Sequence, residues 1–341
     1  MRRSCKGAGR RHSPWLWVGI EKRSLAWWRR RYSLPVRAHR VNGPGIERRL
    51  PTSHVNVETI MKKFSHMRSV PALCTAFLLS LACLKPALAG DIEERLKALM
   101  AEHEVVGLAV VVVRDNDVVY SNAFGWKDRE ARIPLAQDDL YRIASISKSF
   151  AATSIFQLEA QGRLSLDDDA GKLIGFPVRN PEFPDRAITL RMLLNHTSSI
   201  TDGPNYGNLD VLNPGSGEAW RDRYADRAPG DGYEYSNLGY NMIGTIVERV
   251  SGQRFDAYVK AHVLDPLGLH GGYAPDDLEA DRFVSIYRWR EGEGFVRSDQ
   301  AYAPLGARLD NYRMGYDTPM FSPTGGMKIS ASDLARYMLM H

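Results

Sequence analysis

The chain divides at residue 89 into two parts of opposite charge, and this division limits what each part can fold into. Residues 1–89 hold 18 Lys and Arg against three Asp and Glu, and all three cysteines. Residues 90–341 hold 27 Lys and Arg against 37 Asp and Glu, a net charge of −10, with no cysteine. These 252 residues can bury one large core or two modest ones, without a disulfide or a thiolate metal site. The pI near 9.0 therefore does not indicate a nucleic-acid-binding core.

Residues 61–89 have the order of parts that is typical of a secretory signal peptide. A basic start is followed by an apolar stretch, residues 70–84, and Ala87 and Ala89 supply the small residues of a cleavage site before Gly90. The apolar stretch is shorter than the ~20 residues that a membrane-spanning helix needs. We therefore expect an exported protein, periplasmic or extracellular, with no stable membrane insertion after cleavage.

Residues 1–60 precede this signal peptide and are rich in Arg, with four of the seven Trp but no helical or strand period. One interpretation is a basic, aromatic arm that binds membrane or nucleic acid. An export signal that begins 60 residues into a chain has no use, however. We therefore interpret residues 1–60 as a non-native or disordered basic extension and expect no nucleic-acid partner.

Hydrophobic periodicity in the later part predicts an α+β protein, because a β-hairpin is followed mainly by helices. Residues 264–316 are mixed and turn-rich. The hairpin is expected over 105–124, and helices over 91–104, 145–162, 187–195, 237–250, 255–263 and after Ser330, which with Asp333 fits a capping box.

The segment Ser145-Ile146-Ser147-Lys148 is the sharpest chemical feature, and it is the only S-x-x-K in the chain. If Ser145 begins a helix, Lys148 lies one turn later on the same face. A serine hydroxyl is a weak nucleophile until a base takes its proton, and a lysine whose pKa is lowered by burial can be that base. A serine N-cap beside a solvated lysine is the structural alternative.

A phenol and an amide that converge on this serine would complete such a site, and Y-x-N occurs three times. Tyr120 begins the first in the predicted hairpin, and Tyr206 begins the second in a Gly/Pro-rich loop. The third lies directly before a predicted helix, which would hold Tyr235 and Asn237 rigidly. Position therefore favours Tyr235 and Asn237, with a packed tyrosine and an asparagine N-cap as the structural alternative.

In this order, these motifs resemble the serine β-lactamase and penicillin-binding protein superfamily, in its class C β-lactamase, D-alanyl-D-alanine carboxypeptidase and esterase-like branch. The similarity covers residues 90–341, and the set is specific although each piece alone is common. Its pieces are Ser145–Lys148, Leu193-Leu194-Asn195-His196-Thr197-Ser198-Ser199-Ile200, Tyr235-Ser236-Asn237, Asp265-Pro266-Leu267-Gly268-Leu269 and Pro323-Thr324-Gly325-Gly326-Met327. The resemblance implies a β-lactamase/transpeptidase-like fold: an antiparallel sheet domain with flanking helices plus a mainly helical domain.

The resemblance also implies acyl transfer through a covalent acyl-enzyme, on an amide, β-lactam or ester carbonyl of a small-molecule or peptide-like substrate. Ser145 would attack the carbonyl, Lys148 and Tyr235 would manage its proton, and Asn237 would hold the amide side chain of the substrate. Whether Lys148 or Tyr235 is the main base stays open. No cofactor or metal is implied, and the histidines after residue 89 lack ligand spacing. His196 belongs to the loop pattern and is expected to be structural.

Two departures from the family pattern matter. Ser199 stands where the loop usually has glycine, which affects a turn but not the chemistry. The third family motif, Lys-Thr-Gly or His-x-Gly on a later strand, is absent, and the segment His270-Gly271-Gly272 comes too early in the chain to be that motif.

We therefore expect that the C-terminal strands are missing and that residues 90–341 form an incomplete serine hydrolase domain whose opening hairpin keeps an exposed edge. The missing strand usually donates the second oxyanion N–H, whose loss alone costs about 10²–10³ in kcat. The chain as written is accordingly expected to be inactive or barely active. The alternative function is a non-catalytic protein on the same fold that binds peptidoglycan or another ligand.

Overall fold

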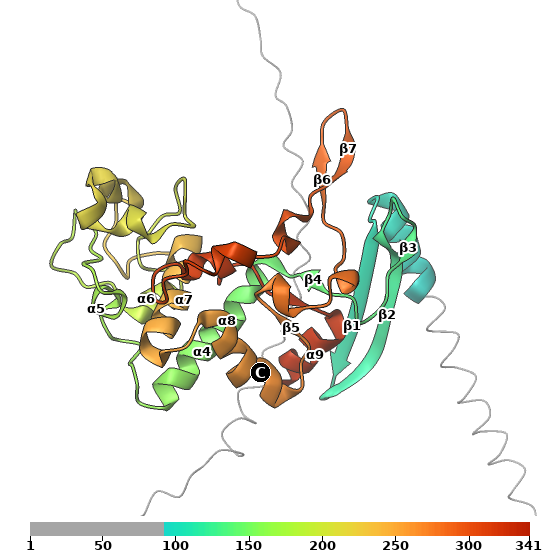
Figure 1. The fold of residues 1–341 in the computed structure, drawn as a ribbon, viewed down its shortest axis with the longest axis horizontal. Helices are drawn as coiled ribbons and strands as arrows, with labels where there is room; N and C mark the ends of the chain where they lie inside the picture. The colour runs from blue at the N-terminus through green and yellow to red at the C-terminus, as the bar shows by residue number, and fades with distance from the viewer. Residues whose placement is uncertain (1–91) are drawn as a thin grey trace, which may run out of the picture. The chain divides into compact units, whose positions relative to one another are not determined.

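The computed structural model describes residues 92–341 (Figure 1). The predictions for residues 1–60 and for the signal peptide at 61–89 lie outside the described residues. Within residues 92–341, no helix combines the length and the apolar character that crossing a membrane requires.

A long antiparallel hairpin opens the described part, after a helix over residues 92–102. Its strands are β1 (Gly107–Arg114) and β2 (Asp117–Asp128), and β3 (Ile133–Pro134) pairs with β2. The turn residues Asp115 and Asn116 both have positive φ, 52° and 71°, as a type I′ turn requires. The sheet order is β1-β2-β3, so β1 is an edge strand among the described residues. Helix α9 (Ala331–Met340) packs against β1.

A second, smaller antiparallel sheet joins three short strands that are far apart in the chain. Its order is β4-β8-β5, with β4 at Tyr141–Arg142, β8 at Lys328–Ile329 and β5 at Gly271–Gly272. A Cβ on Gly271 would lie 2.6 Å from the Lys328 carbonyl oxygen, so this close pairing requires glycine. This second sheet holds the segment directly before Ser145.

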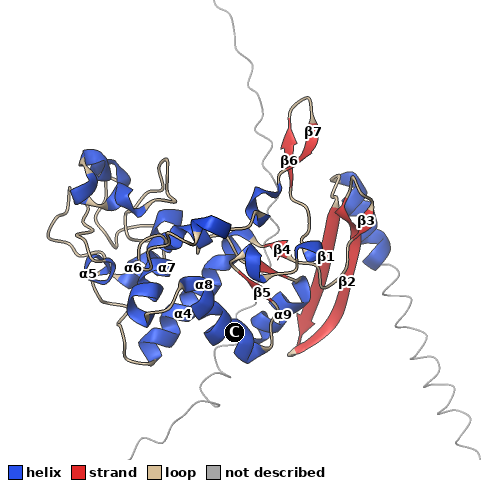
Figure 2. Ribbon diagram, viewed as in Figure 1, coloured by secondary structure: helices blue, strands red, loops and turns tan. Residues whose placement is uncertain are grey.

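The predicted helices are present within a few residues of their expected bounds. They are α4 (Ser147–Ala160), α6 (Leu190–Leu194), α7 (Asn237–Ser251) and α8 (Phe255–Val259), which continues as a π turn, Lys260–Leu264. The short helix α5 (Ala170–Ile174) was not predicted. Ser330 caps α9 as predicted, because its Oγ accepts from the Asp333 N–H at 3.0 Å. Helices α4–α8 gather on one side and β1–β3 on the other, with β4, β5 and α9 between them (Figure 2). This mixture confirms the α+β class.

The turn-rich region contains a hairpin that the sequence does not distinguish, β6 (Tyr287–Arg290) and β7 (Gly294–Arg297), which projects from the rest (Figure 1). Short 3₁₀ turns make up much of the remaining connections. They lie at Ala144–Ile146, Leu209–Leu212, Pro214–Ser216, Glu218–Arg223, Asp265–Leu267, Pro275–Asp277, Ala280–Arg282, Asp299–Tyr302, Gly306–Arg308 and Thr318–Phe321.

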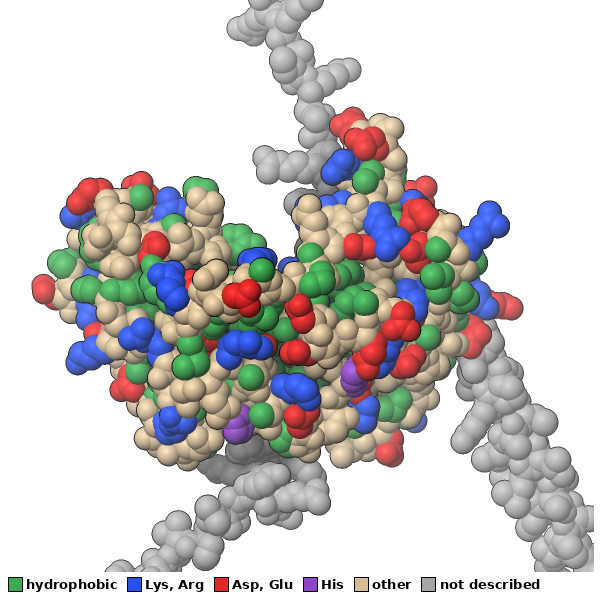
Figure 3. Space-filling view, viewed as in Figure 1, with side chains coloured by type: hydrophobic (Ala, Val, Ile, Leu, Met, Phe, Trp, Pro, Cys, Tyr) green, Lys and Arg blue, Asp and Glu red, His purple; other side chains and the backbone are tan. Residues whose placement is uncertain are grey.

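The core is centred on α7, which packs against α4, α5, α6 and α8. Its buried side chains include Leu238, Met242, Ile243, Ile246 and Val247. The surface is different in character: basic and acidic side chains are interspersed on the face drawn in Figure 3. The hydrophobic core therefore holds α4 and α7 rigidly against each other.

Candidate active site

Ser145 lies in the 3₁₀ turn between β4 and α4, and its side chain is exposed. The expected α-helix start at Ser145 is therefore wrong by two residues. Ala144, directly before it, has a φ of 48°, in the left-handed region that residues with a Cβ seldom adopt. The β4–β8 pairing and the start of α4 fix this strained backbone from both sides. Ser145 is thus presented at a sharp strand-to-helix turn.

Lys148 occupies the first turn of α4, is only 6% exposed, and points back to the serine. Its Nζ lies 3.2 Å from Ser145 Oγ, 2.8 Å from Asn237 Oδ1 and 2.9 Å from the Thr324 carbonyl oxygen. Burial lowers the pKa of Lys148 to about 8; the charge of Asp202 opposes this shift and that of Arg142 adds to it. A fraction of the amine near one in ten is therefore neutral at pH 7.

Tyr235 approaches the serine from the other side, at the end of the loop before α7. Its hydroxyl donates to Ser145 Oγ at 2.7 Å, and the residue is 40% exposed. Lys148 Nζ lies 4.8 Å from the centre of this ring, and the His196 ring lies 4.5 Å away. The Ser145 oxygen is therefore contacted by both an amine and a phenol.

Asn237 is the first residue of α7, but it does not cap the helix: the Ser236 hydroxyl does, accepting from the Gly239 N–H at 3.0 Å. The Asn237 side chain is left to the site, where its Oδ1 accepts from Lys148 and from Thr324 Oγ1. The structure thus brings together all four residues that the sequence singled out. Their roles in chemistry stay predictions.

Asp202 is a site residue that the sequence analysis missed. Its carboxylate accepts from the backbone N–H groups of Asn237 and Leu238 and from Asn237 Nδ2. It therefore accepts hydrogen bonds from N–H groups at the start of α7 that have no partner within the helix, and it fixes the orientation of the Asn237 amide. In the sequence, only its position could have pointed to it: Asp202 lies two residues after the motif that ends at Ile200. The surrounding Thr-Asp-Gly-Pro stretch is typical of an ordinary turn.

His196 supports the site without contacting the serine. Its Nδ1 accepts from the Ser236 N–H at 3.1 Å, which places any proton of the neutral ring on Nε2. Burial, and then the Lys148 charge, lower the His196 pKa. Ser199, in place of the usual glycine, has a φ of 64°, so this turn does use the conformation that glycine adopts without strain.

The other motif copies serve elsewhere. Asn122 of the first Y-x-N donates to Glu93, and the Tyr206 carbonyl of the second accepts from Asn241. His270 is paired with Glu279. In residues 92–341, no group of three or more His, Cys, Asp or Glu is arranged to hold a metal ion.

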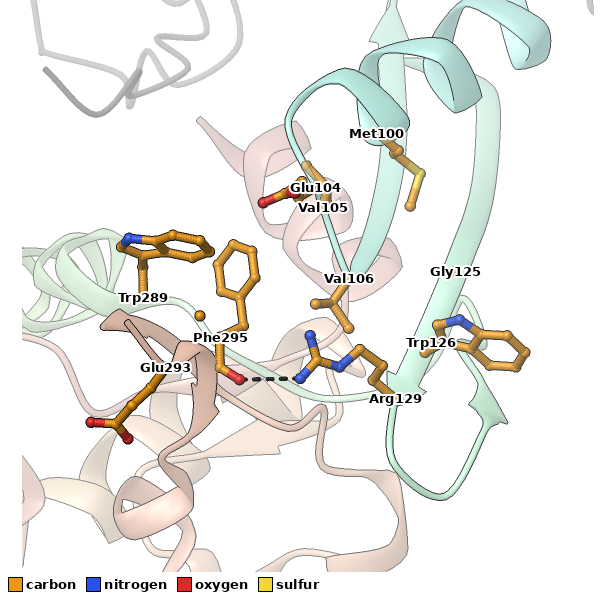
Figure 4. A pocket seen from close by; sticks show the side chains of 11 residues that line it. Met100, Glu104, Val105, Val106, Gly125, Trp126, Arg129, Trp289, Glu293 and Phe295 are labelled. Carbon is orange, nitrogen blue, oxygen red and sulfur yellow. Dashed lines mark hydrogen bonds between the residues drawn. The ribbon is translucent and has the colours of Figure 1, made fainter. Parts of the chain in front are cut away.

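A pocket of about 540 Å³ lies apart from the serine, between β2 and the β6–β7 hairpin (Figure 4). Its walls carry the aromatic rings of Trp126, Trp289 and Phe295, and Arg129 donates to the Phe295 carbonyl at 3.1 Å. This lining combines no hydroxyl nucleophile with a base, so it does not offer the chemistry of the Ser145 site.

Known proteins resemble this chain in sequence and in fold. The Beta-lactamase family model matches residues 92–341. Esterase EstB of Burkholderia gladioli is 31% identical over 288 residues, which cover 77% of this chain and 71% of the esterase. The octameric penicillin-binding protein homologue from Pyrococcus abyssi is 30% identical with a TM-score of 0.60, over 74% of this chain and 56% of that one.

A class C β-lactamase from Rhodobacter sphaeroides shares the fold, with a TM-score of 0.53 and 22% identity over 70% of this chain and 62% of that one. This chain thus spans between about half and seven tenths of the length of these three proteins. The family model covers well over half of this chain, and the fold and the predicted resemblance are confirmed. The chain belongs to the β-lactamase family of serine hydrolases.

Proposed function

We propose that Ser145 attacks the carbonyl carbon of an ester or amide, including a β-lactam, to form an acyl-enzyme that water then hydrolyses. The observation that carries this proposal is the pair of contacts on one oxygen: Ser145 Oγ lies 3.2 Å from Lys148 Nζ and 2.7 Å from Tyr235 Oη. Both distances are within reach of direct proton transfer.

Lys148 is the base in this proposal. A neutral amine has two N–H groups and one lone pair. Asn237 Oδ1 and the Thr324 carbonyl oxygen accept the two N–H groups, at 2.8 and 2.9 Å, which leaves the lone pair for the Ser145 hydroxyl. Attack forms the Oγ–carbon bond while the serine proton moves to Nζ.

Tyr235 is then the acid. Its phenol contacts the attacking oxygen and is partly exposed, so a leaving group beside Ser145 comes within its reach. As the bond from the carbonyl carbon to the leaving group breaks, the phenol gives its proton to that group and regains one from the Lys148 ammonium. A water molecule that repeats this sequence on the acyl-enzyme releases the acid and restores Ser145.

Esters are the first substrates to test, because the relative with 31% identity is named an esterase. The decisive experiment labels the chain with a fluorophosphonate probe and locates the label by peptide mass spectrometry. Label on Ser145, absent in Ser145→Ala, supports the proposal, whereas equal labelling of both proteins contradicts it.

Hydrolysis of 4-nitrophenyl butyrate and of nitrocefin is measured in parallel. Acylation and turnover are separate readouts. A non-catalytic binding protein would show saturable binding of a β-lactam with neither a label nor turnover.

Export is a separate proposal, supported only by the composition of residues 61–89. Expression of the whole chain in a bacterium, with mass spectrometry of the exported protein, tests it. A mature N-terminus at Gly90 is expected; an intact N-terminus in the cytosolic fraction would contradict export.

A further inference from the structure

A second cavity, of about 340 Å³, collects basic side chains although the domain as a whole is acidic. The cavity lies between the β6–β7 hairpin with its following segment and the stretch over residues 320–328. Four cationic residues line it: Arg142, Arg288, Arg308 and Lys328. Within residues 92–341, none of the four has a carboxylate within salt-bridge distance, whereas many other arginines of this domain are paired.

Lys328 is the most telling of the four, because it is only 4% exposed. Its Nζ donates to the Tyr273 carbonyl oxygen at 2.5 Å, and this is its one hydrogen bond to the described residues. An ammonium group has three N–H donors, and burying it without a counter-ion is unfavourable. Burial, and then the Arg142 charge, lower its pKa to about 7.

The nearby acid does not serve as the missing partner. The carboxylate of Asp276 accepts from the backbone N–H groups of Leu305 and Gly306, at 2.7 and 3.2 Å. Its charge acts on Lys328 from beyond salt-bridge distance. The cavity therefore has a buried amine and three arginines whose side-chain N–H groups are available to a ligand. The planar guanidinium group of arginine is well suited to binding a planar carboxylate or a phosphate through two hydrogen bonds.

We propose that this cavity is a binding site for the oxyanion group, carboxylate or phosphate, of a small ligand. The ligand group would enter between Arg288 and Arg308 at the exposed rim and be held by Lys328 at the base. An oxyanion there supplies the acceptors that the Lys328 amine lacks.

The cavity adjoins the proposed acylation site across one short stretch of backbone. The Thr324 carbonyl contacts Lys148 on one side, while Ser322 and Gly326 line the cavity. A Cβ on Gly325 would lie 3.1 Å from Arg142 Nη2 and 3.7 Å from the Ala144 carbonyl carbon. The oxyanion therefore has two possible sources, an acidic group on the acyl substrate itself or a separate small anion.

Binding is tested without catalysis, in the Ser145→Ala chain, by calorimetric titration with inorganic phosphate and with succinate at constant ionic strength. We expect binding of at least one anion, about ten-fold weaker in Arg288→Gln/Arg308→Gln and weaker again when Lys328→Met is added. Arg290→Gln is the matched control, because Arg290 is on the same strand but pairs with Glu293 and does not line the cavity. Its affinity should stay within two-fold.

Absence of binding for both anions, or equal affinities in Arg288→Gln/Arg308→Gln and Arg290→Gln, would overturn the proposal. Since Lys328→Met alters a buried residue, the two exposed arginines keep the test valid if that variant does not fold. This test uses no enzymatic activity, so its failure is distinguishable from failure of the proposed function.

The source of the anion is decided by fluorophosphonate acylation of the active chain. Competition is measured with 4-nitrophenyl butyrate and with the mono-4-nitrophenyl ester of succinic acid. If the oxyanion is an acidic group of the substrate, the concentration needed for half-maximal competition rises about ten-fold in Arg288→Gln/Arg308→Gln for the succinate ester alone. If phosphate binds but both esters are unaffected, the site takes a separate anion.

Discussion

At the scale of single residues, the charge state of one amine governs the proposed chemistry. Lys148 must be neutral to take the Ser145 proton, and its pKa is lowered to about 8 by burial. The second-order rate constant for fluorophosphonate labelling should therefore rise about ten-fold per pH unit below 8 and level off above it. Rate measurements from pH 6 to 9.5 check this, and a flat profile would exclude Lys148 as the base.

Replacing that amine tests the same point by a different route. Lys148→Arg keeps the positive charge but cannot lose it, so labelling should fall by about 10²–10⁴, the usual contribution of a general base. Lys172→Arg is the control, since Lys172 is exposed on α5. Circular dichroism of both variants shows whether the fold is kept. Labelling of Lys148→Arg at the rate of the control would contradict the proposal.

Asp202 gives a prediction that concerns positioning. Asp202→Asn removes the charge that raises the Lys148 pKa, while its amide oxygen can still accept from the N–H groups of Asn237 and Leu238. The midpoint of the pH profile should therefore move to lower pH, and the plateau should fall about ten-fold as Asn237 loses its Nδ2 acceptor. A lower plateau with an unmoved midpoint would point to a structural role alone.

The sequence predicted the site residues that carry local motifs and missed those defined by folding. Ser145 and Lys148 are one helical turn apart, so spacing alone brings them together. Asp202 shows no such spacing with Asn237, and the two meet because a loop with positive φ at His196 and Ser199 returns to the start of α7. In a sequence, glycine is the usual sign of a positive φ. His196 and Ser199 give no such sign, so the sequence does not reveal the course of this loop.

At the scale of elements, a buried carboxylate connects α7 to the segment that leads to Thr324. Glu248 is fully buried and accepts from the N–H groups of Phe255 and Gly315 and from the hydroxyls of Tyr312 and Thr318. Glu248→Gln sets an NH₂ group against these donors, which should reduce the free energy of unfolding by about 2–4 kcal/mol. Urea denaturation measures it.

Glu182→Gln is the matched control, because Glu182 is exposed and forms no salt bridge within residues 92–341. Its unfolding midpoint should not move measurably. Hydrogen exchange over residues 312–321 should also become faster in Glu248→Gln alone. If the two variants have equal stability, the network around Glu248 does not hold this segment in place.

The turn of the opening hairpin provides the second prediction at this scale. Asn116 has a φ of 71°, which glycine adopts without strain, so Asn116→Gly should stabilise the domain by about 0.5 kcal/mol. Thermal unfolding should show a Tm higher by about 1–2 °C. Asp117→Gly, one residue further and inside β2, should lower the Tm instead. A decrease of the same size in both variants would contradict the turn assignment.

The elements divide into those that periodicity reveals and those that it cannot. The opening hairpin and α7 carry clear patterns of apolar residues, and both were predicted. β4, β5 and β8 have two residues each, too few for a period, and they form because distant segments meet. The β6–β7 hairpin is exposed on many positions, so alternation does not mark it.

At the scale of the whole molecule, two buried amines should set the pH dependence of stability. The folded-state pKa values are about 8 for Lys148 and about 7 for Lys328, against 10.5 for a free lysine. Between about pH 7 and 10 the unfolded chain therefore binds more protons than the folded one, and stability rises with pH in this window. Burial raises the pKa of Tyr240 and Tyr302 to about 12, so stability falls again once unfolded tyrosines ionise near pH 10.

Thermal unfolding between pH 6.5 and 10.5 should accordingly give a Tm that climbs to a maximum near pH 9–10, well above neutrality. Lys328→Met removes one of the two amines that lose a proton on folding, so the Tm of this variant should rise less steeply between pH 7 and 9. The control is Lys172→Met, which removes an exposed lysine. Both variants remove the same charge from the unfolded chain, so the comparison isolates the protonation of Lys328 in the folded state. If the plots of Tm against pH for the two variants are parallel, Lys328 keeps its proton in the folded state. The ammonium group would then need a partner that residues 92–341 do not supply.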